Sequence, residues 1–378
     1  MANEAFGSCE IIVGGMRYGN FLRLSFKRDK EEATSSGTIT LGWPGAEMFT
    51  ATSGPMMEVV DGVRGTLILD GQLACTFRVD SRTSHGTPDT YQLEISFRGL
   101  ASAIVDSHAD HPSGQENKRT PGQISKKLME GYEPQLEDKS GESRKLERFI
   151  VQEGESVERA MRRACREFGL IFNENEQGNV VLQKKGMEEG GGGQPLILGR
   201  NFYEWSVKRD MSPRYQKVKA KGNAVPTDKK YGKEAEELAG EAIDNYVKFK
   251  KEYHLLIDSD HEKESLKQRA VSEAQRRKAA GIDVQLTMST WSDDGGQLWK
   301  VGKTHQVVIP VDGVADQLQI KTVQFDLDRG TRKAIVTLVG KDSFGGEGAG
   351  GGAADSGGAA AGGAASMFDS PISGSILS

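Results

Sequence analysis

Alternation of apolar and polar residues is the dominant pattern in the chain, and it predicts β-strands. In residues 282–289, Val284, Leu286 and Met288 alternate with polar residues, as in a strand with one buried face. Residues 293–296, Asp-Asp-Gly-Gly, predict a turn because glycine accepts positive φ at little steric cost. Further short strands are predicted at residues 306–309, 324–327 and 334–338. Strands at this spacing favour a barrel or a sandwich.

A second β-rich block precedes Asp106. Its predicted strands are residues 38–41, 65–69, 74–79 and 91–97. Asp70-Gly71 lies between two of them and predicts a hairpin turn. In the last strand the apolar residues fall on one face, so we expect one side to be core and the other to face solvent or a partner.

Helices enter the pattern after Ser107. The sequence Thr120-Pro121-Gly122-Gln123 predicts a helix start, with a threonine cap and proline at the first helical position. A second helix is predicted within residues 155–168, where apolar residues recur at helical spacing, and Gly169 predicts its end. Strands are predicted at residues 149–151, 170–172 and 180–182, the last two as a hairpin.

A third block follows a glycine-rich joint. It opens with a strand in which Tyr203, Trp205 and Val207 alternate with polar residues, and it continues through a strand at residues 217–220. Residues 227–241 are charged, interrupted by glycines and poor in apolar residues, so we expect an excursion outside the core. Residues 265–280 are predicted to be helical, with weak amphipathicity.

These patterns predict a β-dominated α+β fold with two barrel-like β domains flanking smaller α/β inserts. The expected organisation is an N-terminal β-barrel-like domain at 1–106, an inserted α/β domain at 107–186, a flexible joint at 187–200, a second β-barrel-like domain at 201–344 with a charged and helical insert at about 223–280, and a disordered Gly/Ala-rich tail at 345–378.

Composition narrows the class of protein. A chain of 378 residues is long enough for several domains, and its formal charge of −5 gives no long-range attraction to nucleic acid or anionic lipid. Cys9, Cys75 and Cys165 are too few and too scattered for a disulfide framework, so we expect reduced core residues. No secretory signal or membrane-spanning run is visible. We therefore expect a soluble protein made in a reducing cytoplasm.

Candidate catalytic chemistry is sparse. The best cluster is Asp106-Ser-His108-Ala-Asp110-His111, which could ligate zinc or transfer protons, although its spacing matches no helix-face arrangement. We expect it to be a solvated connector. The glycines at 190–193 lack the lysine and hydroxyl of a phosphate-binding loop. The sequence thus predicts no enzyme, no catalytic residue, no cofactor and no metal site.

Aromatic residues in loops are the candidates for partner contacts. These candidates are Trp43, Phe49, Trp291 and Phe368. A tryptophan in a loop is often an interface anchor, although burial against its own domain is the more frequent alternative for Trp43 and Trp291. Phe368 belongs to the few apolar residues at the end of the Gly/Ala-rich tail.

Several segments in order resemble the baseplate hub proteins of contractile tails, of the Mu-like and late-control-protein-D type. The segments are residues 95–106, 120–125, 149–160, 210–218 and 294–302. The resemblance as a whole covers nearly all of residues 5–344. The four-glycine joint at Gly190 and the Gly/Ala-rich tail depart from the family pattern.

The resemblance implies a structural protein that is not an enzyme. It implies a homotrimer forming a threefold ring at the end of the tail tube, with two related barrel domains per subunit. The implied partners are the tail tube protein, the central spike protein and baseplate wedge proteins, with no nucleic-acid contact outside a central channel and no membrane insertion by this chain. The implied location is the virion tail baseplate, after assembly in the bacterial host cytoplasm.

One alternative is a binding module for the cell wall. Residues 149–170 resemble the strand and helix that open a LysM peptidoglycan-binding domain, but the rest of a LysM unit is hard to place. A wall hydrolase is a weaker alternative, because no paired carboxylates occur in a recognisable setting.

Overall fold

The computed structural model describes residues 9–19, 21–44, 61–87, 89–111, 113–166, 168–184, 192–222, 238–257, 263–341 and 343–344. Strands dominate this part of the chain, with a few helices, so the predicted β-dominated α+β class is confirmed. The predicted domain boundaries and the barrel-like shape stay predictions. The Gly/Ala-rich tail and most of the glycine joint lie outside the described residues.

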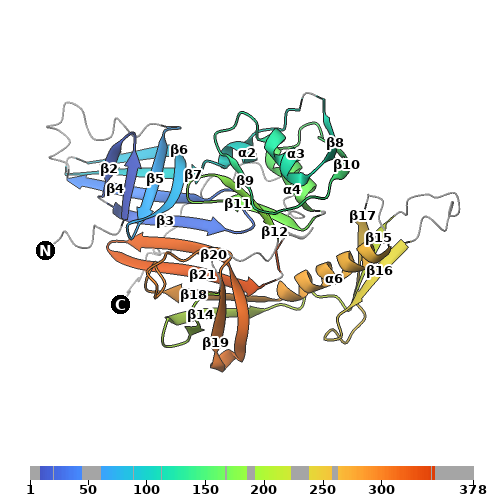
Figure 1. The fold of residues 1–378 in the computed structure, drawn as a ribbon. Helices are drawn as coiled ribbons and strands as arrows, with labels where there is room; N and C mark the ends of the chain where they lie inside the picture. Colours follow the sequence, from blue (N-terminus) through green and yellow to red (C-terminus); the bar gives the residue numbers. More distant parts are fainter. Residues whose placement is uncertain are drawn as a thin grey trace, which may run out of the picture. The chain divides into compact units, whose positions relative to one another are not determined.

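Most strands belong to one long sheet (Figure 1). Its order is β14-β18-β21-β20-β3-β4-β7-β6-β5-β1-β2, and β19 pairs with both β13 and β20 beside this path. The N-terminal members are β1 (Cys9–Val13), β2 (Met16–Tyr18), β3 (Phe21–Asp29), β4 (Ser36–Pro44), β5 (Arg64–Leu69), β6 (Gln72–Gly86) and β7 (Thr90–Gly99). The C-terminal members are β13 (Leu196–Ile197), β14 (Phe202–Arg209), β18 (Ile282–Met288), β19 (Thr304–Ile309), β20 (Val314–Asp328) and β21 (Thr331–Gly340).

Two features of these strands agree with the predictions from local sequence patterns. Val284, Leu286 and Met288 are fully buried in β18, and the predicted hairpin joins β5 to β6. Both turn residues, Asp70 and Gly71, have positive φ, as a tight hairpin requires.

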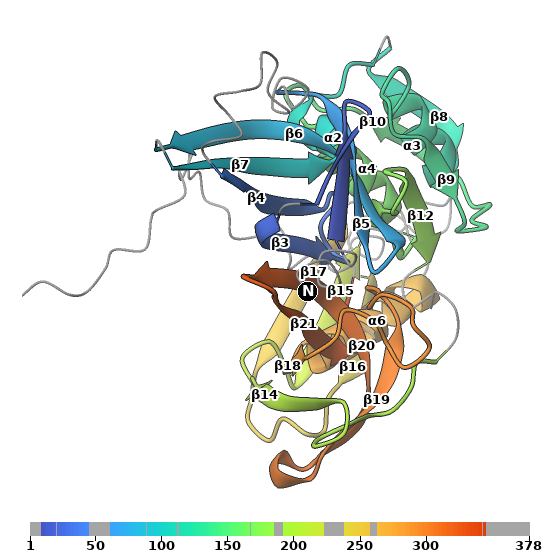
Figure 2. The same ribbon diagram turned by 90° about the vertical axis from the view of Figure 1, so that its left-hand side faces the viewer.

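The N-terminal and C-terminal halves of the long sheet meet at β3 and β20. These strands lie side by side (Figure 2) and pair in antiparallel register. Phe26 lies opposite Phe325 in this register. Phe26 is fully buried and stacks between Phe97 and Phe325, at centroid distances of 6.1 and 6.2 Å. One hydrophobic core contains buried residues of both halves. The two β blocks therefore share a sheet and a core, which their sequence patterns did not predict.

Residues between β7 and β13 include an α/β insert. Its elements are α2 (Ser102–Asp106), β8 (Gln115–Arg119), α3 (Pro121–Leu128), β9 (Leu136–Asp138), β10 (Leu146–Ile150), α4 (Val157–Arg166), β11 (Leu170–Glu174) and β12 (Val180–Lys184). The predicted capping box at Thr120 is confirmed, since the Thr120 hydroxyl accepts from the Gln123 amide and the Gln123 side chain accepts from the Thr120 amide. β8 pairs with β10, and β12 lies between β11 and β9.

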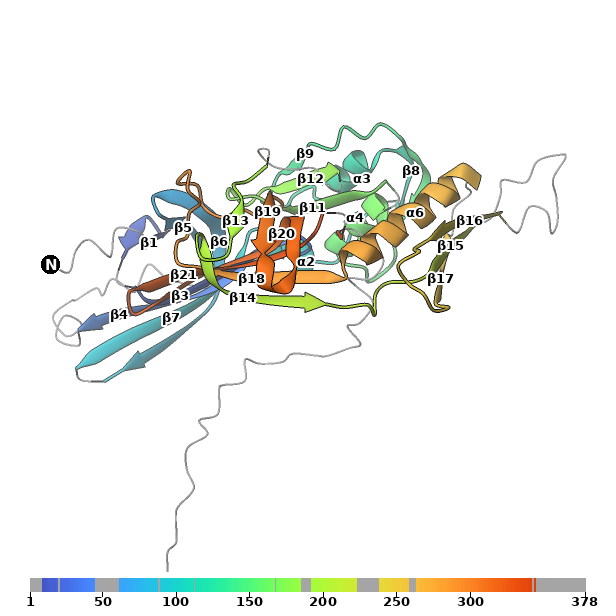
Figure 3. The same ribbon diagram turned by 90° about the horizontal axis from the view of Figure 1, so that it is seen from below.

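A separate three-stranded sheet carries the helix α6 on one face (Figure 3). Its strands are β15 (Lys217–Gly222), β16 (Leu238–Ile243) and β17 (Glu252–Ile257), and α6 spans Lys263–Ala279. The last four residues of 227–241, the segment expected to form an excursion outside the core, belong to β16 of this separate sheet. Gly240 lets α6 come close, because a Cβ there would lie 2.2 Å from the amide nitrogen of Lys267.

Candidate interaction surfaces

The end strand β14 presents the most conspicuous exposed aromatics. Among the described strands β14 pairs only with β18, and on its other side Phe202 forms an isolated bridge with Leu198. No described strand pairs with the rest of this edge, which is therefore open to another strand. Tyr203 is 71% exposed and Trp205 is 38% exposed. Val311, in the short turn η2 (Pro310–Asp312), is 72% exposed. Large apolar side chains beside an open strand edge are typical of protein–protein contacts.

Contacts hold the Trp205 side chain in place. Its indole N–H donates to Asp312 Oδ2 at 2.6 Å, and Arg209 donates to the carbonyl oxygens of Asp312 and Gly313 at 3.4 Å. Because these hydrogen bonds already fix the orientation of the Trp205 side chain, less side-chain entropy would be lost when a partner binds it. We refer to β14 together with η2 as the β14 edge.

A groove of about 500 Å³ lies near the end of β14. Met211 and Tyr246 line it, and Tyr246 is 67% exposed. The Arg214 guanidinium lies 4.4 Å from the Tyr246 ring centroid and donates to both carboxylate oxygens of Asp244. These residues form an ordered polar surface without a catalytic arrangement.

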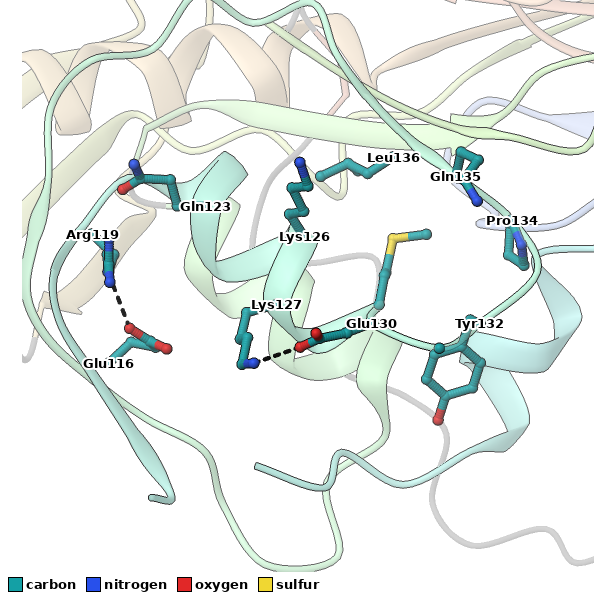
Figure 4. A pocket seen from close by; sticks show the side chains of 12 residues that line it. Glu116, Arg119, Gln123, Lys126, Lys127, Glu130, Tyr132, Pro134, Gln135 and Leu136 are labelled. Atoms are coloured by element: carbon teal, nitrogen blue, oxygen red, sulfur yellow. Dashed lines mark hydrogen bonds and ion pairs between the residues drawn. The ribbon is translucent and has the colours of Figure 1, made fainter. Parts of the chain in front are cut away.

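A second hollow, of about 530 Å³, lies on the insert beside α3 (Figure 4). Ion pairs Arg119–Glu116 and Lys127–Glu130 lie at its rim, and Tyr132 lines another part of the wall. The pair with Glu130 raises the pKa of Lys127, so this lysine stays cationic at neutral pH. The hollow is lined by side chains of both charges and by an aromatic ring. Ion-paired side chains of this kind typically contact solvent or another protein.

The cluster at residues 106–111 does not converge on one site. Arg98 donates to Asp106 at 3.0 Å and holds the pKa of that carboxyl below its ordinary value. His111 Nε2 lies 3.1 Å from Glu116 Oε1, while His108 forms an isolated bridge with Ser156. Across the described ranges, no group of three or more His, Cys, Asp or Glu side chains could hold a metal ion.

The three cysteines are free and buried, as expected. Burial raises the pKa of the Cys75 and Cys165 thiols to about 12, so neither supplies a thiolate nucleophile at neutral pH. Within the described part of the chain, no helix has the length and apolar character needed to span a membrane.

Of the four aromatic candidates, Trp291 is corrected to a core residue. Its side chain is 1% exposed, and its indole N–H donates to the carbonyl oxygens of Asp326 and Lys333. The acidic turn beside it suggested exposure, but the ring packs edge-on against Phe325. The Trp43 backbone belongs to β4, and its side chain lies outside the described residues, as do Phe49 and Phe368 entirely.

Sequence reasoning identified β14 as a strand but did not single out its aromatics as exposed residues. The alternation of Tyr203, Trp205 and Val207 is equally compatible with a central strand, because it does not show whether one or two neighbours pair with it. Val311 follows a proline in a turn, a context that gives no sign of its 72% exposure.

Comparison with known proteins identifies the insert. Residues 101–184 match the family model described as baseplate hub protein gp44-like, second domain. This range coincides with the segment from α2 to the end of β12. It includes residues 149–168, which resembled the opening of a LysM domain and form β10 and α4 here.

Longer comparisons extend beyond the insert. Over 278 residues the chain is 26% identical to the baseplate hub protein gp44 of Escherichia phage Mu, covering 71% of each protein. The 43 kDa tail protein of prophage MuSo2 from Shewanella oneidensis has a TM-score of 0.76 and 19% identity, covering 89% of this chain and 99% of that chain. A tail protein from Neisseria meningitidis has a TM-score of 0.73 and 17% identity, covering 89% and 98%.

The two structural matches show a fold shared with phage tail proteins. The class that these matches define is one of fold, because the chain has the fold of these tail proteins. More particularly, the matches to gp44 and to its second domain confirm the resemblance to Mu-like baseplate hub proteins that the sequence indicated.

Proposed function

We propose that this chain is the subunit of a homotrimeric baseplate hub, a ring that joins the tail tube of a contractile particle to its central spike. The match to Mu gp44 over 71% of both proteins carries the proposal. The expected partners are the tube protein, the spike protein and wedge proteins of the virion baseplate, with assembly in the host cytoplasm.

A structural role is consistent with the chemistry of the surface. Ion pairs engage charged residues that line the two hollows, Arg214 near β14 and Arg119 and Lys127 on the insert. The conspicuous exposed groups are aromatic and aliphatic side chains. Such groups contribute to protein–protein binding and do not act as catalytic groups.

The β14 edge is the surface we assign to contact between subunits. An open strand edge invites pairing with another chain, and closure into a ring removes this liability. Tyr203 and Trp205 would supply aromatic anchors beside the paired backbone.

Sedimentation velocity with three proteins tests this assignment. We expect the unmodified chain to sediment as a trimer. The double variant Tyr203→Lys/Trp205→Lys should dissociate at the same concentration, because lysine on an edge strand opposes pairing. Phe249→Lys is the matched control, since Phe249 is 57% exposed but lies outside the long sheet, and it should remain a trimer.

The outcomes separate the two parts of the proposal. An unmodified chain that stays monomeric at every concentration would contradict the homotrimer. A double variant that remains trimeric would leave the homotrimer standing and show that β14 is not its contact surface.

A further inference from the structure

The insert touches the long sheet through a buried carboxylate. Glu174 ends β11, and only 4% of its surface is exposed. Its Oε1 accepts a hydrogen bond from the Ala101 amide at 3.0 Å. Its Oε2 accepts from the Ser35 amide and the Ser35 hydroxyl, each at 3.1 Å, and from the Thr34 hydroxyl at 3.4 Å. Thr34 and Ser35 belong to the connection between β3 and β4.

Arg28 of β3 adds a second polar contact at the same place. Its guanidinium donates to the Glu176 carboxylate and to the Glu174 carbonyl oxygen, each at 2.9 Å. From β6, the Thr76 hydroxyl donates to the Glu176 carbonyl oxygen at 3.1 Å. The tip of the β11–β12 hairpin is thus held by β3, β6 and the β3–β4 connection together.

Apolar packing contributes little at this junction. The insert has its own hydrophobic core, and all but one of that core's buried members come from residues 101–182. The exception is Ala33, next to Thr34. The insert therefore has the means to stay folded without the sheet, while its orientation depends on directional hydrogen bonds at its boundary.

We propose that Glu174 and its donors form a latch that holds the insert against the long sheet, and that loss of the carboxylate releases the insert as a folded unit. Backbone amides donate to both side-chain oxygens of Glu174, so the site requires a residue with two acceptor oxygens. A carboxamide would set an N–H₂ group against one set of donors and leave them buried without partners. Burial raises the pKa of Glu174, which shows that this site is costly to keep charged.

Gly99 gives a second way to open the latch, from the side of the sheet. A Cβ at Gly99 would lie 1.8 Å from Glu174 Oε2, too close for any real contact. The carboxylate is held on its other sides by its donors, so it has no room to yield. Alanine at position 99 should therefore displace Glu174.

Hydrogen exchange measured by mass spectrometry on the full chain tests the latch, without dependence on the proposed hub function. In Glu174→Gln, peptides containing Ser35 and Ala101 should exchange at least about tenfold faster, because one of the two amides loses its acceptor and the latch that protects both opens. Peptides of β12 and of α4 should keep their protection, since the insert core is intact. Gly99→Ala should give the same pattern.

Two matched variants serve as controls. Glu137→Gln removes a carboxylate that accepts from Asn175 and Asn179 within the insert, so Ser35 and Ala101 should be unaffected. Gly86→Ala adds a Cβ whose nearest neighbour is 3.5 Å away, an ordinary contact. If Glu174→Gln folds too poorly to measure, Glu176→Gln is a milder variant that should show the same pattern to a smaller extent.

Two results would overturn the latch. The first is unchanged exchange at Ser35 and Ala101 in both Glu174→Gln and Gly99→Ala. The second is loss of protection throughout the insert in every variant of the latch, since that would make Glu174 part of the insert's folding core.

Discussion

The long sheet makes two junctions of opposite chemistry. At the first, β3 pairs with β20, and Phe26 stacks between Phe97 and Phe325 in a core shared by both halves. At the second, the insert meets the sheet through polar contacts, among them Ser35 with Glu174, Arg28 with Glu176 and Arg78 with Glu133. Ala33 is the one buried member of the insert's core from outside residues 101–182. Apolar burial is strong and non-directional, whereas buried hydrogen bonds are directional and costly when broken.

This difference predicts which parts of the molecule unfold together and which can separate while folded. The two halves of the long sheet should unfold together, because neither can expose its share of the common core alone. The insert should be able to leave while remaining folded. A chain built in this way keeps a rigid sheet and fixes the orientation of the insert by a small set of contacts.

The largest expected effect tests the apolar junction. Phe26→Ala should lower the free energy of unfolding by about 3–5 kcal/mol, because it leaves a cavity at the centre of the shared core. In a Trp43→Phe background, urea unfolding followed by tryptophan fluorescence reports the C-terminal half, where Trp291 and Trp299 are buried. The midpoint of this signal should fall together with protection of β4 and β7 in hydrogen exchange. A fluorescence midpoint that stays unchanged would show that the two halves unfold separately.

Arg28→Met tests the polar junction. This variant removes the guanidinium donor from the Glu176 carboxylate and from the Glu174 carbonyl, and we expect a cost of about 2–3 kcal/mol. Arg23→Met on the same strand is the control, because Arg23 and Asp328 form an exposed pair and should contribute at most about 1 kcal/mol. Equal effects of the two variants in urea unfolding would argue against a special role for Arg28.

The cap of α3 offers a smaller effect confined to the insert. Thr120→Ala should cost about 1 kcal/mol by removing the acceptor of the Gln123 amide, whereas Thr120→Ser keeps a hydroxyl and should cost less. Hydrogen exchange of α3 measures this. Loss of protection in β3 or β20 would contradict the independence of the insert.

The smallest expected effect depends on pH. Arg144 donates to both carboxylate oxygens of Glu142 at 2.9 Å and lowers the pKa of Glu142 from 4.5 to about 2. Because the folded-state pKa is depressed, the pair stabilises the insert above about pH 4.5, and this contribution is lost as pH falls toward 2. Arg144 is mostly exposed, so the contribution should be at most about 1 kcal/mol. Comparison of Glu142→Gln with the unmodified chain between pH 2 and 6 measures it; an identical pH dependence would contradict the assignment.

Sequence predicted the features that depend on neighbouring residues. The turn at Asp70-Gly71, the cap at Thr120 and the buried face of β18 follow from patterns a few residues long. The strands β1, β2 and β3 were missed. In β3 a bulge between Phe21 and Arg23 breaks the alternation, so its apolar residues do not follow a simple period of two.

Features that depend on distant residues could not be predicted in this way. Glu174 appears in the sequence as a polar residue at the end of a hairpin, and its donors Ser35 and Ala101 lie 139 and 73 positions away. The pairing of β3 with β20 joins residues about 300 positions apart. Likewise, Gly240 looked like a sign of irregular chain, but its glycine serves the close approach of α6.

Electron microscopy of the purified full-length chain tests the central claim most directly. Class averages should show a ring of three subunits around a channel. Particles that are all the size of a single 41.1 kDa chain, at every concentration examined, would contradict the proposed hub.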